Sequence, residues 1–402
     1  MNLFNVNPNY TFNNRCFTRQ LKICNLFLLL VLSLTACNIN SIFKNNKPSI
    51  NPERDLFYQV EILRINNELK KAIILYEDFL LSDPNNFKVR LNYAKTLANI
   101  NQKEKAKSQY EKLNADRPSN KDVIFTLARF AMDEQEYIVA KTYLHQLDNT
   151  DQRAIFNLAK IAEINNQNSL AFNKYLKIQQ GSIYYLNAQL RLASLTAKLE
   201  SIDKARSRLH NIVAKSQEDE KIILEFEGNL LFEFGLYQES YDFFTLLLNT
   251  RIKDSRLLYY RSLSAERLGK IDVVISDLAY VIEQNPNNAK ALNQLGYTLT
   301  NHSKKLPEAL KLIQRARDLS PNNISILDSL GWVHYQLGNY KVSLNILSEA
   351  IKKENNAEIA AHYGEVLWVT GDKQKAVDVW NSIDIGDNNH SILKETKARF
   401  IQ

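Results

Sequence analysis

Cysteine, glycine and proline are all scarce in this sequence of 402 residues. The chain contains 3 Cys, 10 Gly and 8 Pro. The three cysteines, Cys16, Cys24 and Cys37, lie at the N-terminal end, so the remaining chain can form no disulfide, and a disulfide-stapled fold is excluded. Few glycines and prolines mean few turns and few helix breakers, which favours a mostly helical chain with short connections.

The sequence also lacks a large excess of charge of one sign. The formal net charge is +7, and Arg15, Arg19 and Lys22 supply three of those charges before Cys37 without an acidic residue among them. A nucleic-acid-binding domain is expected to show a concentrated basic face. The modest charge of the segment after Cys37 therefore predicts a solvated mixed-charge surface and no nucleic-acid partner.

Long apolar runs are lacking except for one near the N-terminus. Residues 23–34, ICNLFLLLVLSL, form a twelve-residue segment, which is too short for a bilayer span of about 20 residues. Basic residues precede it and the small residues Thr35 and Ala36 follow it. This layout is typical of a secretory signal peptide, which we assign to residues 1–36.

A cysteine ends this segment. The stretch LTAC, residues 34–37, resembles the bacterial lipobox, which implies that the Cys37 thiol is lipidated and that Cys37 begins the mature chain. In enteric lipoproteins, which this segment resembles, Asn38 in the next position favours the outer membrane. The expected location is thus the periplasmic face of the outer membrane, with residues 37–52 as lipidated cysteine and flexible tether. A plain signal peptide with an incidental Cys37 remains the alternative.

The rest of the chain repeats with a stride of about 34 residues. Ala72 and Ala106 are 34 residues apart, as are Tyr76 and Tyr110. Small residues, and one valine, continue the series at intervals of 31 to 35 residues: Ala72, Ala106, Ala140, Ala171, Ala205, Ser240, Val274, Ala309, Ser343 and Ala376. The stride and pattern resemble the tetratricopeptide repeat. The resemblance implies an all-α, right-handed superhelical solenoid of about ten helix-turn-helix repeats over residues 53–388, closed by a capping helix over 389–402.

The pattern has a packing logic. Two helices of one unit can approach closely only where small side chains meet, and a second small position recurs in the first helix of nine units: Ala94, Ala128, Ala159, Ala193, Gly228, Ser262, Gly296, Gly331 and Gly364. Val60 breaks the rule in the first unit. Large residues one turn later fill the space between helices: Tyr76, Tyr110, Tyr175, Phe244, Leu347 and Trp380.

Glycine and proline occur at matching places in these units. Prolines that end second helices are expected at Pro84, Pro118, Pro286 and Pro321. Glycines that end first helices in a left-handed conformation are expected at Gly235, Gly269, Gly338 and Gly371. The unit 289–323 has one extra residue, within NHSKKLPEA (301–309), and Pro307 there suits the first turn of a helix.

Signatures of catalysis are missing. The sequence has no G-x-S-x-G, P-loop, H-E-x-x-H or G-x-G-x-x-G pattern. The six histidines (145, 210, 302, 334, 362 and 390) are spread over different units without metal-ligand spacing, and DIGDNN (384–389) suits a turn better than a calcium loop. We expect no enzyme, no cofactor, no metal and no small-molecule substrate.

The first helices of tetratricopeptide folds line a groove, and the resemblance assigns inward-facing positions. In the early units these positions give a basic ridge: Lys95, Arg129 and Lys160. In the late units they give aromatic residues: Tyr297, Trp332, Tyr335 and Trp368. Aromatic anchors with a polar group are typical of protein interfaces. Two alternatives remain open: the tryptophans pack as core, and the basic ridge is a solvated face.

The last third of the chain resembles a narrower family. The strings ILDSLGW (326–332) and EIAAHYGEVLW (358–368) are similar to the C-terminal part of proteobacterial outer-membrane lipoproteins built of tetratricopeptide repeats. That family resembles the adaptor of a periplasmic carboxyl-terminal processing protease, a serine protease. The resemblance implies a non-catalytic adaptor that activates the protease and presents protein clients. The alternative is a structural scaffold for another envelope assembly, such as a secretion, pilus or polysaccharide-export system.

Overall fold

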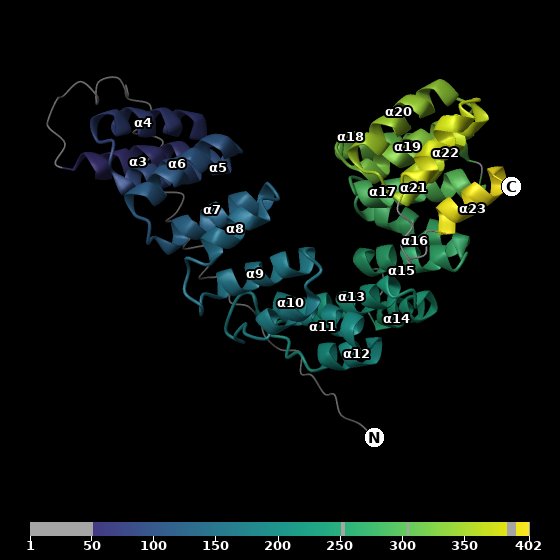
Figure 1. Cartoon of the computed structure of the whole chain (residues 1–402), viewed down its shortest axis with the longest axis horizontal. Coiled ribbons are helices and arrows are strands. Elements are labelled where there is room, and N and C mark those ends of the chain that lie inside the picture. The colour runs from purple at the N-terminus through teal and green to yellow at the C-terminus, as the bar shows by residue number, and fades with distance from the viewer. Residues whose placement is uncertain (1–50, 251–253, 304, 384–390, 402) are drawn as a thin grey trace, which may run out of the picture. The chain divides into compact units, whose positions relative to one another are not determined.

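The computed structural model describes residues 51–250, 254–303, 305–383 and 391–401, and every regular element in these ranges is a helix. The chain divides into two compact units, Met1–Leu147 and Asp148–Gln402. The predicted signal peptide, Cys37 and residues 37–50 of the tether lie outside the described residues. In Figure 1 the two helices of each repeat lie side by side.

The described residues of the first unit form three helix pairs. They are α3 (Pro52–Ile65) with α4 (Leu69–Ser82), α5 (Phe87–Asn99) with α6 (Lys103–Asp116), and α7 (Lys121–Asp133) with α8 (Tyr137–Leu144). Each first helix packs on its own second helix, and each second helix packs on the next first helix. This arrangement is typical of a solenoid, in which a repeat buries its apolar face only against its neighbours.

The second unit contains seven more pairs and a terminal helix. The pairs are α9 (Gln152–Ile164) with α10 (Asn168–Tyr175), α11 (Tyr185–Leu199) with α12 (Ile202–His210), α13 (Gln217–Glu233) with α14 (Tyr237–Thr250), α15 (Ser255–Arg267) with α16 (Ile271–Gln284), α17 (Ala289–Thr298) with α18 (Leu306–Leu319), α19 (Ile324–Gln336) with α20 (Tyr340–Lys353), and α21 (Ala357–Val369) with α22 (Lys373–Asn381). The terminal helix α23 (Ser391–Phe400) packs on α21, with Leu393 fully buried. The predicted all-α array of about ten tetratricopeptide helix pairs is therefore confirmed over the residues that the structure describes.

The small residues occupy the helix crossings, as expected. All ten positions of the second-helix series, from Ala72 to Ala376, are completely buried. A Cβ added at Gly331 would lie 2.5 Å from Leu347 Cγ, and one added at Gly296 would lie 2.5 Å from Ile313 Cγ1. Ordinary carbon contacts are about 3.5–4.0 Å. Glycine at these crossings is thus required by the closeness of the paired helices.

Asparagine begins most first helices, a feature that the sequence reasoning did not use. In the stretch DPNN the proline follows the end of α4, and Asn86 two residues later accepts a hydrogen bond at its Oδ1 from the backbone N–H of Val89 (3.0 Å). The same N-cap geometry recurs at Asn51, Asn120, Asn288, Asn323 and Asn356. An N-cap of this kind contributes about 1 kcal/mol. It fixes where these six repeats start.

The ends of the first helices use a left-handed residue in eight repeats. Glycine supplies it in four, including Gly338 at φ +78, which confirms that expectation. In the other four repeats the position is held by Asn67, Asn101, Gln135 and Asn166. A non-glycine residue pays a conformational cost there, so these four ends are less favourable than the glycine ends.

One boundary differs from the sequence expectation, and one irregular turn accounts for the extra residue. The first helix begins at Pro52 with Asn51 as its N-cap, so residues 51–52 belong to the first repeat and not to the tether. The extra residue of the 289–323 unit is accommodated by a π-helical turn, η1 (Leu299–Ser303), directly after α17. Pro307 stands in the first turn of α18, as expected. π-helical turns are frequent at functional sites, and this one contributes to the cavity described next.

Candidate protein-binding site

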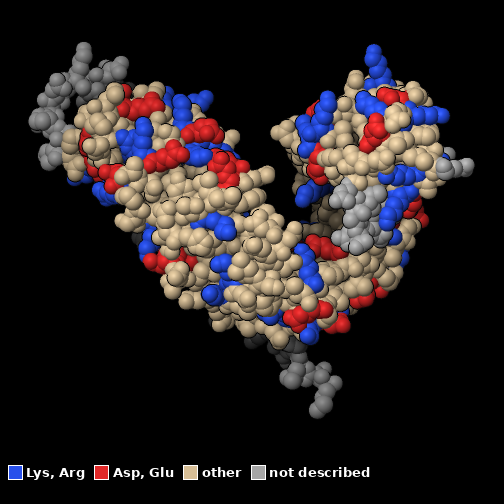
Figure 2. Space-filling model, viewed as in Figure 1, with Lys and Arg blue, Asp and Glu red and all other residues tan. Residues whose placement is uncertain are grey.

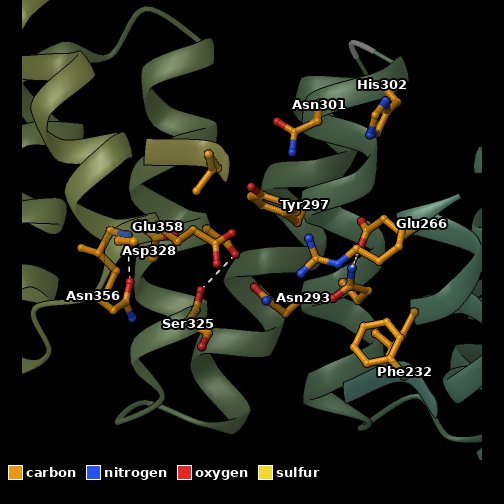
Figure 3. Close-up of a pocket in the computed structure, with 17 residues that line it drawn as sticks. Phe232, Glu266, Asn293, Tyr297, Asn301, His302, Ser325, Asp328, Asn356 and Glu358 are labelled. Carbon is orange, nitrogen blue, oxygen red and sulfur yellow. Dashed lines mark hydrogen bonds between the residues drawn. The ribbon is translucent and has the colours of Figure 1, made fainter. Parts of the chain in front are cut away.

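A cavity of about 780 Å³ opens on the first helices of the second unit. Its wall comes from α13, α15, α17, α19 and α21, with two residues from η1 and Ile392 from α23. Figure 3 shows the lining side chains converging from these helices. The cavity thus lies on the inward face of the first helices, in the late repeats where aromatic groove residues were predicted.

One side of the cavity is polar and buried. Glu266 accepts hydrogen bonds from Gln294 Nε2 (2.5 Å) and Thr298 Oγ1 (3.0 Å). Burial raises the pKa of the Glu266 carboxyl, although the hydrogen bond from Thr298 opposes the shift. Asn293 Oδ1 is buried and has no hydrogen-bond partner among the described residues. A buried acceptor without a partner costs free energy.

The other side of the cavity is acidic. Asp328 of α19 and Glu358 of α21 both line it, and Tyr297 lies opposite them (Figure 3). Burial and the charges of Glu358 and Asp328 raise the pKa of the Tyr297 phenol well above its ordinary value. The phenol therefore stays protonated, and its hydrogen bond with Glu358 contributes to the raised pKa.

A buried histidine stands behind this acidic side. His362 Nδ1 lies 2.9 Å from Asp328 Oδ2 and 3.1 Å from Oδ1, and both side chains are almost completely buried. Burial alone would lower the pKa of His362, but the carboxylates of Asp328, Glu358 and Glu365 outweigh it and raise the pKa. Along the sequence the six histidines are spread over different repeats. The structure instead brings His362 together with the carboxylates of Asp328, on the preceding first helix, and Glu358, one turn earlier on its own helix.

The predicted aromatic residues do not all reach the cavity. Tyr297 lines it, but Trp332 is only 8% exposed and stacks on His362 with ring centroids 4.2 Å apart. The indole N–H of Trp332 donates to Asn301 Oδ1 (2.8 Å). These contacts favour the alternative of core packing for Trp332, so it cannot serve as an open anchor.

Tyr335 and Trp368 are partly buried in contacts within the unit. The Tyr335 hydroxyl donates to Glu365 Oε1 (3.2 Å). Trp368 stacks on Trp380 with centroids 5.7 Å apart and lies 5.9 Å from the Phe400 ring of α23. Most of the aromatic surface that the sequence assigned to a partner is thus used to hold α19, α21 and α23 together.

The basic residues are exposed but are not brought into one site. Lys95 and Arg129 are exposed on α5 and α7 of the first unit, and Lys160 is exposed on α9 of the second. No salt bridge holds any of the three among the described residues. A continuous ridge over all three therefore stays a prediction.

Basic and acidic side chains are interspersed over the face shown in Figure 2, without a large area of one sign. This agrees with the low net charge of the sequence. Among the described helices none combines the length and the apolar character that a bilayer crossing requires.

Comparisons with known proteins agree on the class of fold. A family model described as tetratricopeptide repeat matches residues 259–324 and 329–389. The chain is 33% identical over 214 residues to the TPR repeat-containing protein PA4667 of Pseudomonas aeruginosa, an alignment that covers 53% of this chain and 36% of that protein. The aligned part thus spans only about a third of that relative.

Solved structures are similar to parts of the chain. TTC0263, a thermophilic TPR protein of Thermus thermophilus, is 17% identical with a TM-score of 0.39, over 44% of this chain and 96% of that one. A tetratricopeptide repeat protein from Parabacteroides merdae is 15% identical with a TM-score of 0.47, over 70% of this chain and 98% of that one. Tetratricopeptide repeats are scaffolds for binding other proteins, and the cavity on the first helices is the candidate binding site.

Proposed function

We propose that the chain is a lipid-anchored, non-catalytic adaptor of the cell envelope that binds a periplasmic carboxyl-terminal processing protease and presents protein clients to it. The anchor rests on the sequence LTAC at residues 34–37 and on the apolar segment before it. Asn38 supports the outer membrane as the location. The tetratricopeptide fold supports a protein as the partner.

The cavity on the first helices is the observation that carries the binding function. Its volume of about 780 Å³ suits a few side chains of an inserted polypeptide segment rather than a folded domain. Arg267 offers N–H donors, and the carboxylates of Asp328 and Glu358 offer acceptors. A backbone segment with its own N–H and C=O groups would satisfy both kinds of group.

The resemblance to protease adaptors falls on the same helices. ILDSLGW (326–332) lies in α19 and EIAAHYGEVLW (358–368) lies in α21. Asp328 and Glu358, one in each string, line the cavity. The stretches that resemble the adaptor family therefore build one wall of the candidate site, which favours the adaptor over the envelope scaffold.

The test is capture of a partner from detergent-solubilised envelopes with the lipidated full-length chain as bait. Asn293→Arg places a bulky charge in the cavity, and Asn345→Arg, on an exposed position of the second helix α20, is the matched control. We expect a serine protease to be captured by the wild-type and Asn345→Arg chains and reduced at least about tenfold with Asn293→Arg. Circular dichroism checks that each variant keeps its helicity.

Other outcomes contradict the proposal in different ways. Recovery of secretion or pilus components without a protease identifies the scaffold alternative. Capture that is equal with both variants shows that the cavity is not the binding site. Removal of Trp332 would not test capture, because this side chain is in the core and its loss would disturb the fold.

A further inference from the structure

Three metal-ligating side chains converge at the acidic side of the cavity. Asp328 lies on α19, while Glu358 and His362 lie four residues apart on α21 and so share one helix face. Their candidate ligand atoms all lie within 4.8 Å of one another. Ligands at about 2.0–2.2 Å from a zinc ion are at most about 4.4 Å apart, so a small rotation of exposed Glu358 completes the triad.

The negative charges of these groups are not compensated by a salt bridge to a lysine or arginine in the described part of the chain. Among the described residues no lysine or arginine forms a salt bridge with Asp328 or Glu358. The neighbouring Glu365 is paired with Arg399 Nη2 at 2.6 Å. Besides the His362 imidazole, the Arg267 guanidinium lines the same cavity, but it forms no salt bridge with either carboxylate. A divalent cation would compensate these charges, above all that of the buried Asp328.

The histidine is held in an orientation suited to coordination. Trp332 stacks on the His362 ring with an interplanar angle of 21°, and the indole is fixed in turn by Asn301. Such supporting contacts keep a ligand imidazole in place. Without an ion, Nδ1 carries the proton that faces Asp328. Coordination replaces that proton with the metal and releases it to solvent.

We propose that Asp328, Glu358 and His362 bind one divalent transition-metal cation of the zinc type. The donor set of one imidazole and two carboxylates suits such an ion better than calcium, which takes six to eight oxygen ligands. Three protein ligands leave a coordination position open toward the cavity, where Tyr297 and Asn293 lie. The site ties α19 to α21 and does not depend on the identity of the protein partner.

The test is zinc titration of the metal-stripped full-length chain by isothermal calorimetry. Glu358→Gln removes a ligand from an exposed position, so folding is preserved, whereas Glu349→Gln on the exposed face of α20 is the matched acidic control. We expect one zinc equivalent to bind the wild-type and Glu349→Gln chains equally. The affinity should fall at least about tenfold in Glu358→Gln.

Two further measurements keep the result specific. His145→Gln removes an exposed histidine far along the chain and should leave zinc binding unchanged. Calcium should bind at least about tenfold more weakly than zinc. The proposal is overturned if the wild-type chain shows no saturable zinc binding, if Glu358→Gln binds as tightly as wild type, or if calcium binds more tightly than zinc.

Discussion

Gly331→Ala tests the packing argument at a single helix crossing. The new Cβ would lie 2.5 Å from Leu347 Cγ and 2.7 Å from Leu347 Cδ2, about 1 Å short of an ordinary contact. Leu347 is completely buried, and Cγ lies next to its own backbone, so it cannot swing aside. The helices are also joined there by Ser343, whose Oγ donates to the Gly331 carbonyl at 2.8 Å.

The magnitude follows from two opposing effects. Overpacking of this kind costs about 1–3 kcal/mol, and the replacement of a helical glycine by alanine returns about 1 kcal/mol. Because the displacement needed is large and the neighbour is rigid, we expect the upper end of the cost. The free energy of unfolding should therefore fall by about 1–2 kcal/mol.

Tryptophan fluorescence during urea unfolding is the suitable assay. The chain has 3 Trp, and Trp332, Trp368 and Trp380 all lie in α19, α21 and α22, so the signal reports on the repeats next to the substitution. Gly181→Ala is the control, because nothing lies within 4 Å of its added Cβ. It should change stability by less than about 0.5 kcal/mol.

A double-mutant cycle separates overpacking from other effects. Leu347→Ala alone should cost about 2–5 kcal/mol by leaving a cavity. Combined with Gly331→Ala it should cost about 1–3 kcal/mol less than the sum, because the steric conflict disappears with the leucine. Additive effects, or a Gly331→Ala chain that is more stable than wild type, would refute the close-approach reasoning.

Three more perturbations test other parts of the structure. Asp277 is 3% exposed, and its carboxylate accepts hydrogen bonds from the Arg261 guanidinium at 2.7 and 2.8 Å. Arg261→Ala leaves this buried charge uncompensated, so the free energy of unfolding measured by fluorescence should fall by about 3–5 kcal/mol. A fall below about 1 kcal/mol would contradict this. Hydrogen bonds from the Arg153 side chain, and from backbone N–H groups, lower the pKa of the N-cap residue Asp151, although burial opposes this shift. The ionised Asp151 therefore stabilises the fold above its ordinary pKa, and this stabilisation is lost as the pH falls through the lowered pKa. Asp151→Ala should accordingly cost about 1 kcal/mol at pH 7 by circular dichroism and clearly less near pH 3, and a gap that widens in acid would be inconsistent with it. Gln135→Gly should stabilise the first unit by a few tenths to about 1 kcal/mol in thermal unfolding, since φ is +63 there; destabilisation would show that its side chain matters more than its backbone.

The fold was predictable from the sequence because small residues at a regular spacing mark the positions where paired helices cross. Small residues such as Ala72 and Gly331 recur at the stride of the repeat, and each one is buried at a helix crossing. The left-handed ends at Gly338 and its counterparts followed from glycine spacing. The left-handed conformation of Gln135 could not be predicted in this way, because its side chain does not reveal a backbone conformation that the neighbouring helices impose.

The candidate site was only partly predictable. Of the positions predicted to face inward, Tyr297 lines the cavity, whereas Trp332 is buried. The burial of such a residue depends on which helix packs behind it. Asp328 and His362 are 34 residues apart, about one repeat. That separation was a usable signal, since a repeat places such residues on adjacent first helices. The contribution of Asn301 could not be foreseen, because it depends on the π-helical turn.

The measurement that tests the central claim most directly is site-specific photocrosslinking in envelopes. The three cysteines lie before residue 51. In the proposed mature chain Cys16 and Cys24 are removed with the signal peptide, and Cys37 is blocked by lipid. A thiol-reactive photocrosslinker then attaches only at an introduced cysteine. Asn293→Cys should crosslink a protein partner through the cavity, while Asn345→Cys on the outer helix should not. Crosslinking from Asn345→Cys alone would contradict the account and place the partner on the second helices.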